Sequence, residues 1–148
     1  MIDRKQQIYD LATRLFAPAE WPYIQTSLDT CLVEHTQTLF DETGHCVAFV
    51  IVNRAEDGNA FFSYCGVSPG HQGKGYGSKL LKETLAGIFQ VDYPATRLYV
   101  DTWNVDALRL YTRFGFKIIG NDVVAGSSCH LLEMTCEEWK KSQVYISR

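Results

Sequence analysis

The stretch Val67-Ser-Pro-Gly-His-Gln-Gly-Lys-Gly-Tyr-Gly-Ser-Lys-Leu-Leu81 determines how the rest of the chain is interpreted. An apolar run at residues 60–67 precedes its glycines, and large apolar residues recur at helical spacing over residues 80–89 after them. The pattern predicts a strand, a glycine-rich turn and a helix that begins near Gly75. The first N–H groups of a helix have no partners within the helix and lie at the positive end of its dipole. This turn is therefore suited to binding a phosphate or pyrophosphate.

Three glycines within five residues, Gly73, Gly75 and Gly77, leave room for an anion to approach the backbone. Lys74 adds a positive charge between the first two of them. The alternative is a tight turn that binds nothing. Because glycines at the start of a helix cost stability, an anion-binding role is the more economical interpretation.

Two well-known phosphate-binding motifs do not match this turn. A P-loop requires Lys-Ser or Lys-Thr directly after its second glycine, but Tyr76 and Gly77 follow Gly75. The dinucleotide-binding fingerprint requires a third glycine where Ser78 or Leu80 stands, depending on which glycine starts the pattern. The turn therefore belongs to another class of anion site.

Length and composition predict one globular domain spanning residues 1–148, with 46% hydrophobic and 21% charged residues. The net charge of −3 provides no strongly cationic surface for nucleic acid. No apolar run approaches the roughly 18 residues of a membrane span, and the N-terminus is too polar for a signal peptide. We therefore expect a cytoplasmic protein that binds neither nucleic acid nor membrane.

The five cysteines are odd in number, scattered, and without a Cys-x-x-Cys pair. This pattern favours reduced intracellular thiols that mostly fill the core. Cys129 and His130 are the only adjacent Cys and His, and neighbours on a strand point to opposite faces. We therefore predict no metal site.

Periodicity and turn residues predict the elements of the first half. An amphipathic helix is expected at residues 3–16 with Asp3 as its N-cap. Residues 22–34 favour a second helix, although Cys31 could open a strand. Three β-prone runs separated by turns then predict an antiparallel meander: residues 36–40, 46–52 and 60–67.

In the second half, the helix after the glycine turn is expected to end near residue 90. Residues 97–101 form a strand, parallel to the strand before the turn because a helix connects the two. Asn104 caps a short helix that Gly115 ends. A hairpin follows at residues 116–124 and 128–136, and the charged tail, residues 137–148, is expected to pack loosely or fray.

A second motif lies in the predicted short helix and just after it: Asn104, Ala107, Leu110, Tyr111, Gly115 and Phe116. Asn104 and Tyr111 are seven positions apart, so we expect both side chains to face the same way. With Gln72-x-x-Gly75-x-Gly77 after a Val-x-Pro strand end, this motif resembles the GNAT N-acetyltransferase superfamily.

The resemblance covers residues 36–135 and implies an α+β (mixed α/β) fold. A GNAT-like fold has a central mixed, largely antiparallel sheet that is splayed at the acetyl-CoA site and flanked by about four helices. Many members begin with a strand, whereas this chain is expected to begin with a helix. We therefore allow for a sheet that lacks the first strand and has an open edge.

The same resemblance implies how acetyl-CoA binds as the acyl donor. The implied binding residues are Cys65, Gly66, Val67, Gln72, Gly73, Lys74, Gly75, Tyr76, Gly77, Ser78, Asn104 and Tyr111. Tyr111 is also the candidate catalytic acid, because a phenol with a pKa of about 10 can protonate a departing thiolate without ionising first. The implied reaction is acetyl transfer to a primary amine by direct attack in a ternary complex.

Several points stay open at this stage. Some members carry a glutamate base on the strand before the turn, but residues 61–66 contain no carboxylate. The candidates for the base are a water chain and four side chains: Glu34, His35, Asp101 and His130. The acceptor is a protein N-terminus, a lysine or a small amine, and the choice between monomer and homodimer is undecided. A non-catalytic acyl-CoA sensor and a subunit of a larger acetyltransferase complex are the alternative functions.

Overall fold

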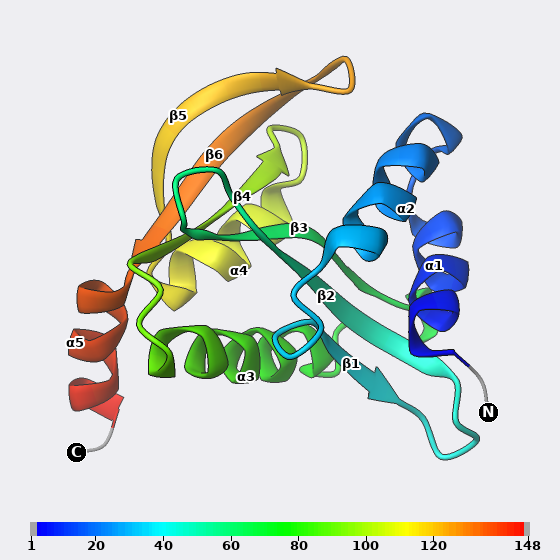
Figure 1. Cartoon of the computed structure of the whole chain (residues 1–148), viewed down its shortest axis with the longest axis horizontal. Helices are drawn as coiled ribbons and strands as arrows, with labels where there is room; N and C mark the ends of the chain where they lie inside the picture. Colours follow the sequence, from blue (N-terminus) through cyan, green and yellow to red (C-terminus); the bar gives the residue numbers. More distant parts are fainter. Residues whose placement is uncertain (1–2, 147–148) are drawn as a thin grey trace. The chain divides into compact units, whose positions relative to one another are not determined.

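The computed structural model describes residues 3–146 of the chain (Figure 1). Its elements are, in chain order, α1 (Arg4–Leu15), the 3-10 helix η1 (Pro18–Glu20), α2 (Trp21–Thr30), β1 (Gln37–Phe40), β2 (Cys46–Arg54), β3 (Ala60–Val67), the 3-10 helix η2 (Pro69–His71), α3 (Tyr76–Gln90), β4 (Ala95–Asp101), α4 (Val105–Phe114), β5 (Lys117–Val124), β6 (Ser127–Thr135) and α5 (Cys136–Ile146).

The strands of the described residues form one mixed sheet in the order β1-β2-β3-β4-β6-β5. β3 and β4 are parallel, as expected for strands joined through a helix. The pairs β1–β2, β4–β6 and β5–β6 are antiparallel. These findings confirm the α+β fold class, with five α-helices in the described part rather than about four. Within that part no strand precedes α1. The splaying of the sheet stays a prediction.

The chain divides into two compact units. The first contains the described residues up to Asn53 together with Ser63–Ala86, and the second contains Arg54–Phe62 together with the described residues from Gly87 onward. We describe each unit by itself. The single domain spanning residues 1–148 stays a prediction.

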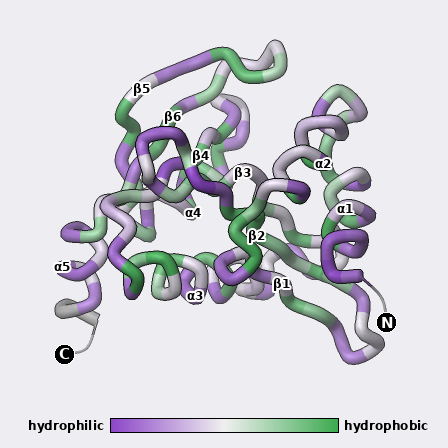
Figure 2. The backbone as a smooth tube through the Cα atoms, in the orientation of Figure 1, coloured by the Kyte–Doolittle hydropathy of each residue, from purple (hydrophilic) through white to green (hydrophobic). Residues whose placement is uncertain are grey.

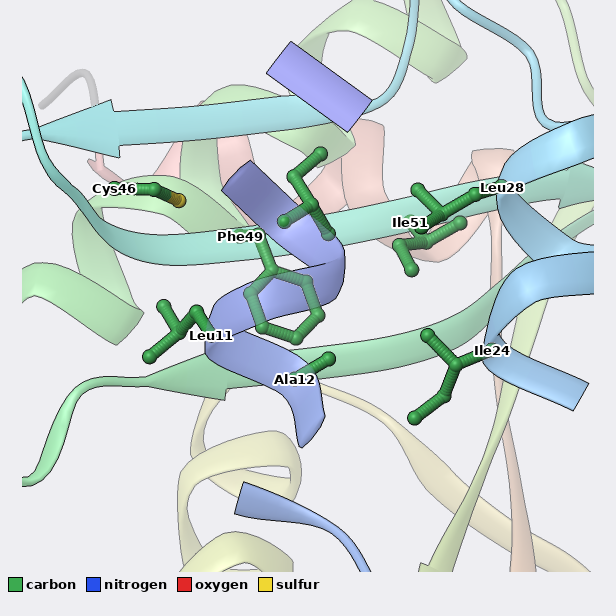
Figure 3. Packing of buried hydrophobic residues seen from close by; sticks show 8 residues of the cluster. Leu11, Ala12, Ile24, Leu28, Cys46, Phe49 and Ile51 are labelled. Atoms are coloured by element: carbon green, nitrogen blue, oxygen red, sulfur yellow. The ribbon is translucent and has the colours of Figure 1, made fainter. Parts of the chain in front are cut away.

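In the first unit, α1 and α2 pack on β2 around Phe49 (Figure 3). Asp3 begins α1 as predicted, because its carboxylate accepts a hydrogen bond from the N–H of Lys5 at 3.0 Å. Ile8 and Leu11 lie on the buried face of this helix. Burial of such an aliphatic side chain contributes about 1.5–3 kcal/mol, which explains why the amphipathic pattern predicts the helix correctly.

The rest of the first unit also follows the predicted order. Residues 46–52 of β2 are all buried, and the tube in Figure 2 is coloured hydrophobic there. The favoured helix at residues 22–34 is confirmed, but it ends earlier, at Thr30, and residues 33–35 form a turn. No strand opens at Cys31.

In the second unit, β5 and β6 form the predicted hairpin, which Figure 1 draws as a long curved ribbon. Ala125 and Gly126 connect the two strands with φ angles of 49° and 78°, the left-handed values that a two-residue hairpin turn requires. Arg97 on β4 forms ion pairs with Asp57, in the turn between β2 and β3, at 2.6 Å and with Glu133 on β6 at 2.7 Å. Arg97 and Glu133 are also directly paired in the β4–β6 register.

The prediction of a loose tail was wrong for the described residues, which form helix α5. Thr135 and Glu138 form a capping box: the Glu138 carboxylate accepts from the N–H of Thr135, and the Thr135 hydroxyl accepts from the N–H of Glu138. The ring of Trp139 packs on Phe89 with centroids 5.6 Å apart. The signature Thr-x-x-Glu is visible in the sequence, whereas the contact with Phe89 is not. Residues 147–148 lie outside the described part.

Candidate functional site

The glycine turn of the first unit has the backbone conformation that an anion cradle needs. Gly73 and Gly75 have φ angles of 76° and 84°, a left-handed conformation that residues with a Cβ rarely adopt. The N–H of Lys79 donates to the carbonyl oxygen of Gly75 at 3.0 Å, so the helical hydrogen bonds of α3 start directly after the turn. The prediction that the helix begins near Gly75 is confirmed.

The space in front of the turn is open. A Cβ atom added to Gly73 or to Gly75 would meet no heavy atom within 4 Å. The N–H groups of Tyr76, Gly77 and Ser78 precede the first helical hydrogen bond, so none of them has a partner four residues earlier in the helix. Backbone donors at a helix start, next to two glycines with unfilled space beside them, fit the pyrophosphate of a nucleotide-linked thioester such as acetyl-CoA.

Side chains of the turn have two roles in this geometry. The amide nitrogen of Gln72 donates to the carbonyl oxygen of Val67 at 3.0 Å, which closes the turn onto the end of β3. The N–H of Ser68 donates to the carbonyl oxygen of Val47 at 2.8 Å and joins the turn to β2. Lys74 is exposed and lies between the two left-handed glycines. Gln72 therefore holds the turn in shape, and Lys74 supplies its positive charge.

The end of β3 contains a glycine of a different kind. A Cβ atom on Gly66 would lie 2.6 Å from Cδ1 of Leu15 and 2.9 Å from Cε1 of Phe49. The side chains of Leu15 on α1 and Phe49 on β2 therefore fill the space that a Cβ atom would need, and at least one of them would have to shift. Cys65 and Val67 on either side of it are partly buried. Packing explains the glycine at 66, and the predicted contact of residues 65–67 with the acyl donor stays a prediction.

In the second unit, Asn104 begins α4 as predicted. Its side-chain oxygen accepts a hydrogen bond from the N–H of Ala107 at 3.2 Å, while its own backbone is not helical. Because Asn104 precedes the first helical residue, helical spacing does not decide whether it faces the same way as Tyr111. That orientation stays a prediction.

The position of Tyr111 is set by the end of α4. Gly115 has a φ angle of 109° and ends the helix, and the N–H of Phe116 donates to the carbonyl oxygen of Tyr111 at 3.1 Å. The partly buried Tyr111 ring meets the Phe116 ring edge-on, with centroids 5.7 Å apart. Phe116 is buried beside Phe62. The second motif thus orients the tyrosine ring through packing.

The candidate bases of the second unit are separate from one another. Asp101 accepts hydrogen bonds from the Ser127 hydroxyl at 2.6 Å and from the Cys129 thiol at 3.4 Å. His130 forms a hydrogen bond through Nδ1 with the side-chain oxygen of Asn121 at 2.7 Å. Asp101 is directly paired with Cys129 in the β4–β6 register, so His130, the next residue, points to the opposite face of the sheet.

The candidate bases of the first unit lie in the turn after α2. Glu34 is exposed, whereas His35 is 9% exposed. Both are within the same short turn, and the N–H of His35 donates to the carbonyl oxygen of Leu32 at 3.0 Å. The structure gives no reason to prefer either of them as the base.

The structure also brings together two residues that sequence reasoning did not connect. The hydroxyl of Tyr64 on β3 donates to Oε2 of Glu20 at 2.5 Å, although the two residues are 44 positions apart. The Tyr64 ring meets Phe16 edge-on at 5.1 Å. Burial and the neighbouring Glu20 carboxylate raise the pKa of Tyr64 far above its ordinary value. No motif around Glu20 signals this contact.

Other kinds of site are not seen in residues 3–146. They contain no group of three or more His, Cys, Asp or Glu side chains that could hold a metal ion. None of the helices in this part is both long and apolar enough to cross a membrane.

The comparison with known sequences identifies the family. The chain belongs to the acetyltransferase (GNAT) family, whose sequence pattern matches residues 5–116. No curated protein matches the chain at a significant level. The family assignment agrees with the glycine turn and the second motif, and acetyl-CoA is the acyl donor that it implies.

Solved structures with the same fold include acetyltransferases of different kinds. Arabidopsis thaliana Naa50 in complex with the bisubstrate analogue CoA-Ac-MVNAL has 22% identity and a TM-score of 0.73, covering 90% of this chain and 95% of that one. The ribosomal-protein alanine N-acetyltransferase of Escherichia coli has 18% identity and a TM-score of 0.70, covering 91% and 90%. Nourseothricin acetyltransferase has 23% identity and a TM-score of 0.59. The match covers 66% of this chain and 62% of the nourseothricin acetyltransferase chain. At these identities the likeness shows the fold.

Proposed function

We propose that this protein is an N-acetyltransferase that transfers the acetyl group of acetyl-CoA to a primary amine by direct attack in a ternary complex. The observation that carries the proposal is the open turn at Gly73 and Gly75, which has left-handed backbone and unfilled space directly before α3. Glycines with this backbone conformation and open space beside them let an anion approach the main-chain N–H groups, which supports donor binding at this turn.

In this proposal the backbone N–H groups of Tyr76, Gly77 and Ser78, with those of the glycine turn, bind the pyrophosphate of acetyl-CoA. Lys74 adds Coulombic attraction, and Gln72 holds the turn against β3. Main-chain groups of residues 65–67 bind the pantetheine arm. Asn104 uses its side-chain oxygen to cap α4, which leaves its amide N–H₂ group to bind the donor.

Tyr111 is proposed as the general acid that protonates the departing thiolate. A phenol suits this role, because it keeps its proton at neutral pH and can release it to a stronger base. Phe116 packs on the Tyr111 ring and limits its rotation. The support for the role is the position of Tyr111 in the second motif.

Among the acceptors, we propose an amino group of a polypeptide before a small amine. Naa50 was solved with a bisubstrate analogue that contains MVNAL, and the E. coli enzyme is named for an alanine of a ribosomal protein. This chain and each of those two cover at least 90% of one another. The likeness to nourseothricin acetyltransferase covers a smaller part of both chains.

The test is a screen of peptides with free N-termini, lysine peptides and small amines, with acetyl-CoA as donor and thiol release as the readout. We expect thiol release that depends on acceptor, and mass spectrometry should find one acetyl group on the acceptor. Stoichiometric acetyl-CoA binding without thiol release across the whole panel would instead identify a non-catalytic sensor. Turnover by the isolated chain would also exclude dependence on a larger complex.

A further inference from the structure

The connector between α1 and α2, residues 16–20, brings a carboxylate to the end of β3. Glu20 is the last residue of η1, and its Oε2 accepts the hydrogen bond of Tyr64. Two further contacts hold the connector: the Phe16 ring on the Tyr64 ring, and the indole N–H of Trp21, which donates to the carbonyl oxygen of Phe16 at 2.9 Å. Glu20 is therefore fixed relative to β3 and does not belong to a loose loop.

The side chain of Glu20 is not required for helix capping. It occupies the N-cap position of α2, but its side chain makes no capping hydrogen bond. The contact with Tyr64 uses one carboxylate oxygen, and Oε1 accepts no hydrogen bond from the described residues. Glu20 itself is partly buried, and Ala17, Pro18 and Ala19 beside it are exposed.

The position of Glu20 makes it a candidate for the catalytic base, which the sequence leaves unidentified. β3 contains no carboxylate at residues 61–66, where some members of the superfamily carry a base. Glu20 supplies one by a tertiary contact with Tyr64, the residue directly before Cys65. Residues 65–67 are the part of β3 where the arm of the acyl donor is proposed to bind. All of these residues belong to the first unit.

We propose that Glu20 is the proton acceptor for the acceptor amine, with Oε1 taking the proton and Tyr64 holding Oε2. The proposal rests on the acetyltransferase function proposed above. In the step, R–NH₃⁺ and the Glu20 carboxylate give R–NH₂ and the Glu20 carboxylic acid. The amine lone pair then forms the C–N bond and the C–S bond breaks. One amine proton stays on the amide. The general acid protonates the thiol sulfur and is restored by the second amine proton, and the proton on Glu20 is released to solvent.

The surroundings of the pair suit this exchange. Besides Glu20, the titratable group whose charge acts on Tyr64 is Tyr23 on α2. At the end of α1, Arg14 donates to the backbone carbonyl of Asp10, so this cation hydrogen-bonds along its own helix. Because the pKa of Tyr64 is strongly raised, its hydroxyl stays a donor across the working pH range and does not compete for the amine proton.

The experiment measures kcat and KM from pH 6 to pH 10 for the wild type, Glu20→Gln, Tyr64→Phe and the control Glu42→Gln, with the acceptor identified in the screen. Glu42 is an exposed carboxylate of the same unit, in the turn before β2. Glutamine preserves an oxygen that can accept from Tyr64 but cannot take a proton at these pH values. At pH 7 we expect Glu20→Gln to lower kcat/KM about 100-fold and to leave acetyl-CoA affinity unchanged.

The pH profile separates the proposed role from a structural one. The deficit of Glu20→Gln should shrink at least 10-fold once the pH exceeds the pKa of the acceptor amine, because the amine then arrives without its proton. Tyr64→Phe keeps the carboxylate, so its profile should keep the wild-type shape with a smaller loss, and Glu42→Gln should match the wild type.

Two results would overturn the inference without touching the proposed function. One is an active wild type with Glu20→Gln equal to it at every pH. The other is a deficit that is equally large for Glu20→Gln and Tyr64→Phe and independent of pH, because both variants would then act through the packing of the connector. A wild type that releases no thiol with any amine would instead contradict the proposed function itself.

Discussion

The turn before α3 and the end of β3 both depend on glycine, for opposite physical reasons. At Gly73 and Gly75 the backbone is left-handed and the space beyond it is open. At Gly66 a Cβ atom would lie 2.6 Å from the Leu15 side chain. The first pair leaves room for the ligand proposed above to approach from outside, and the other glycine lies where two protein segments meet. Glycine in a binding motif is therefore evidence for a ligand only after packing has been excluded.

Gly75→Val should have the largest effect and should act on binding. The new side chain would occupy the open space of the turn, and its branched Cβ would strain a φ angle of 84°. We expect acetyl-CoA affinity to fall at least 100-fold, about 2.7 kcal/mol, as measured by calorimetry. Lys74→Ala, which leaves the backbone unchanged, is the matched control and should weaken binding far less. Equal affinity of Gly75→Val and the wild type would contradict the cradle.

Gly66→Val should act on stability instead. The added atoms would overlap with Leu15 and Phe49, and overpacking of this kind costs about 1–3 kcal/mol. Urea unfolding would measure the loss, and Leu15→Ala in the same chain should recover part of it because it removes one of the two clashes. If Gly66→Val unfolds like the wild type, then the close approach of α1 to β3 is not the reason for this glycine.

Tyr111→Phe should lower turnover much more than binding. Phenylalanine keeps the ring that packs on Phe116 and removes only the hydroxyl. We expect kcat to fall about 30-fold, roughly 2 kcal/mol, with acetyl-CoA affinity changed less than threefold. Phe116→Leu tests the packing of the same ring. Equal losses of turnover and affinity in Tyr111→Phe would assign this tyrosine to donor binding.

The smallest effect is expected outside both regions, at the ion pair between Glu138 and Lys117. The pKa of Glu138 is lowered, first by its hydrogen bond with Lys117. A carboxyl group with a lowered folded-state pKa contributes stability above its ordinary pKa and loses it as the pH falls through the folded-state value. Glu138→Gln should therefore lower the free energy of unfolding by about 0.5 kcal/mol at pH 7 and by less at pH 3. A larger effect at pH 3 than at pH 7 would reverse the assignment.

Activity should rise between about pH 6 and pH 9, because attack requires a neutral amine. Glu20 reduces this dependence in the wild type by taking the proton, so the rise should be steeper in Glu20→Gln. Thiol release at fixed acetyl-CoA would measure both profiles. A flat profile in both proteins would show that amine attack does not limit the rate.

Sequence patterns are most informative where the determinants lie within a few positions of one another. Asp3 and Asn104 cap the helices that follow them, and each cap needs only a side-chain oxygen and an N–H group two or three residues later. Helix α5 follows the same local rule through Thr135 and Glu138, and a prediction from the charge of the tail alone misses this capping box. Its anchor on Phe89 could not be predicted, because Trp139 is 50 positions away from it along the chain.

By itself the sequence determined the glycine turn, the helix start after Gly75 and the succession of strands along the chain, because backbone conformation and periodicity are properties of neighbouring residues. Only the tertiary structure decided that Gly66 is there for packing and that Glu20 meets Tyr64. Such contacts join positions far apart in the chain, and their geometry depends on how α1, its connector and β3 pack together. No local pattern encodes that geometry, so the proposed base becomes visible only in the folded chain.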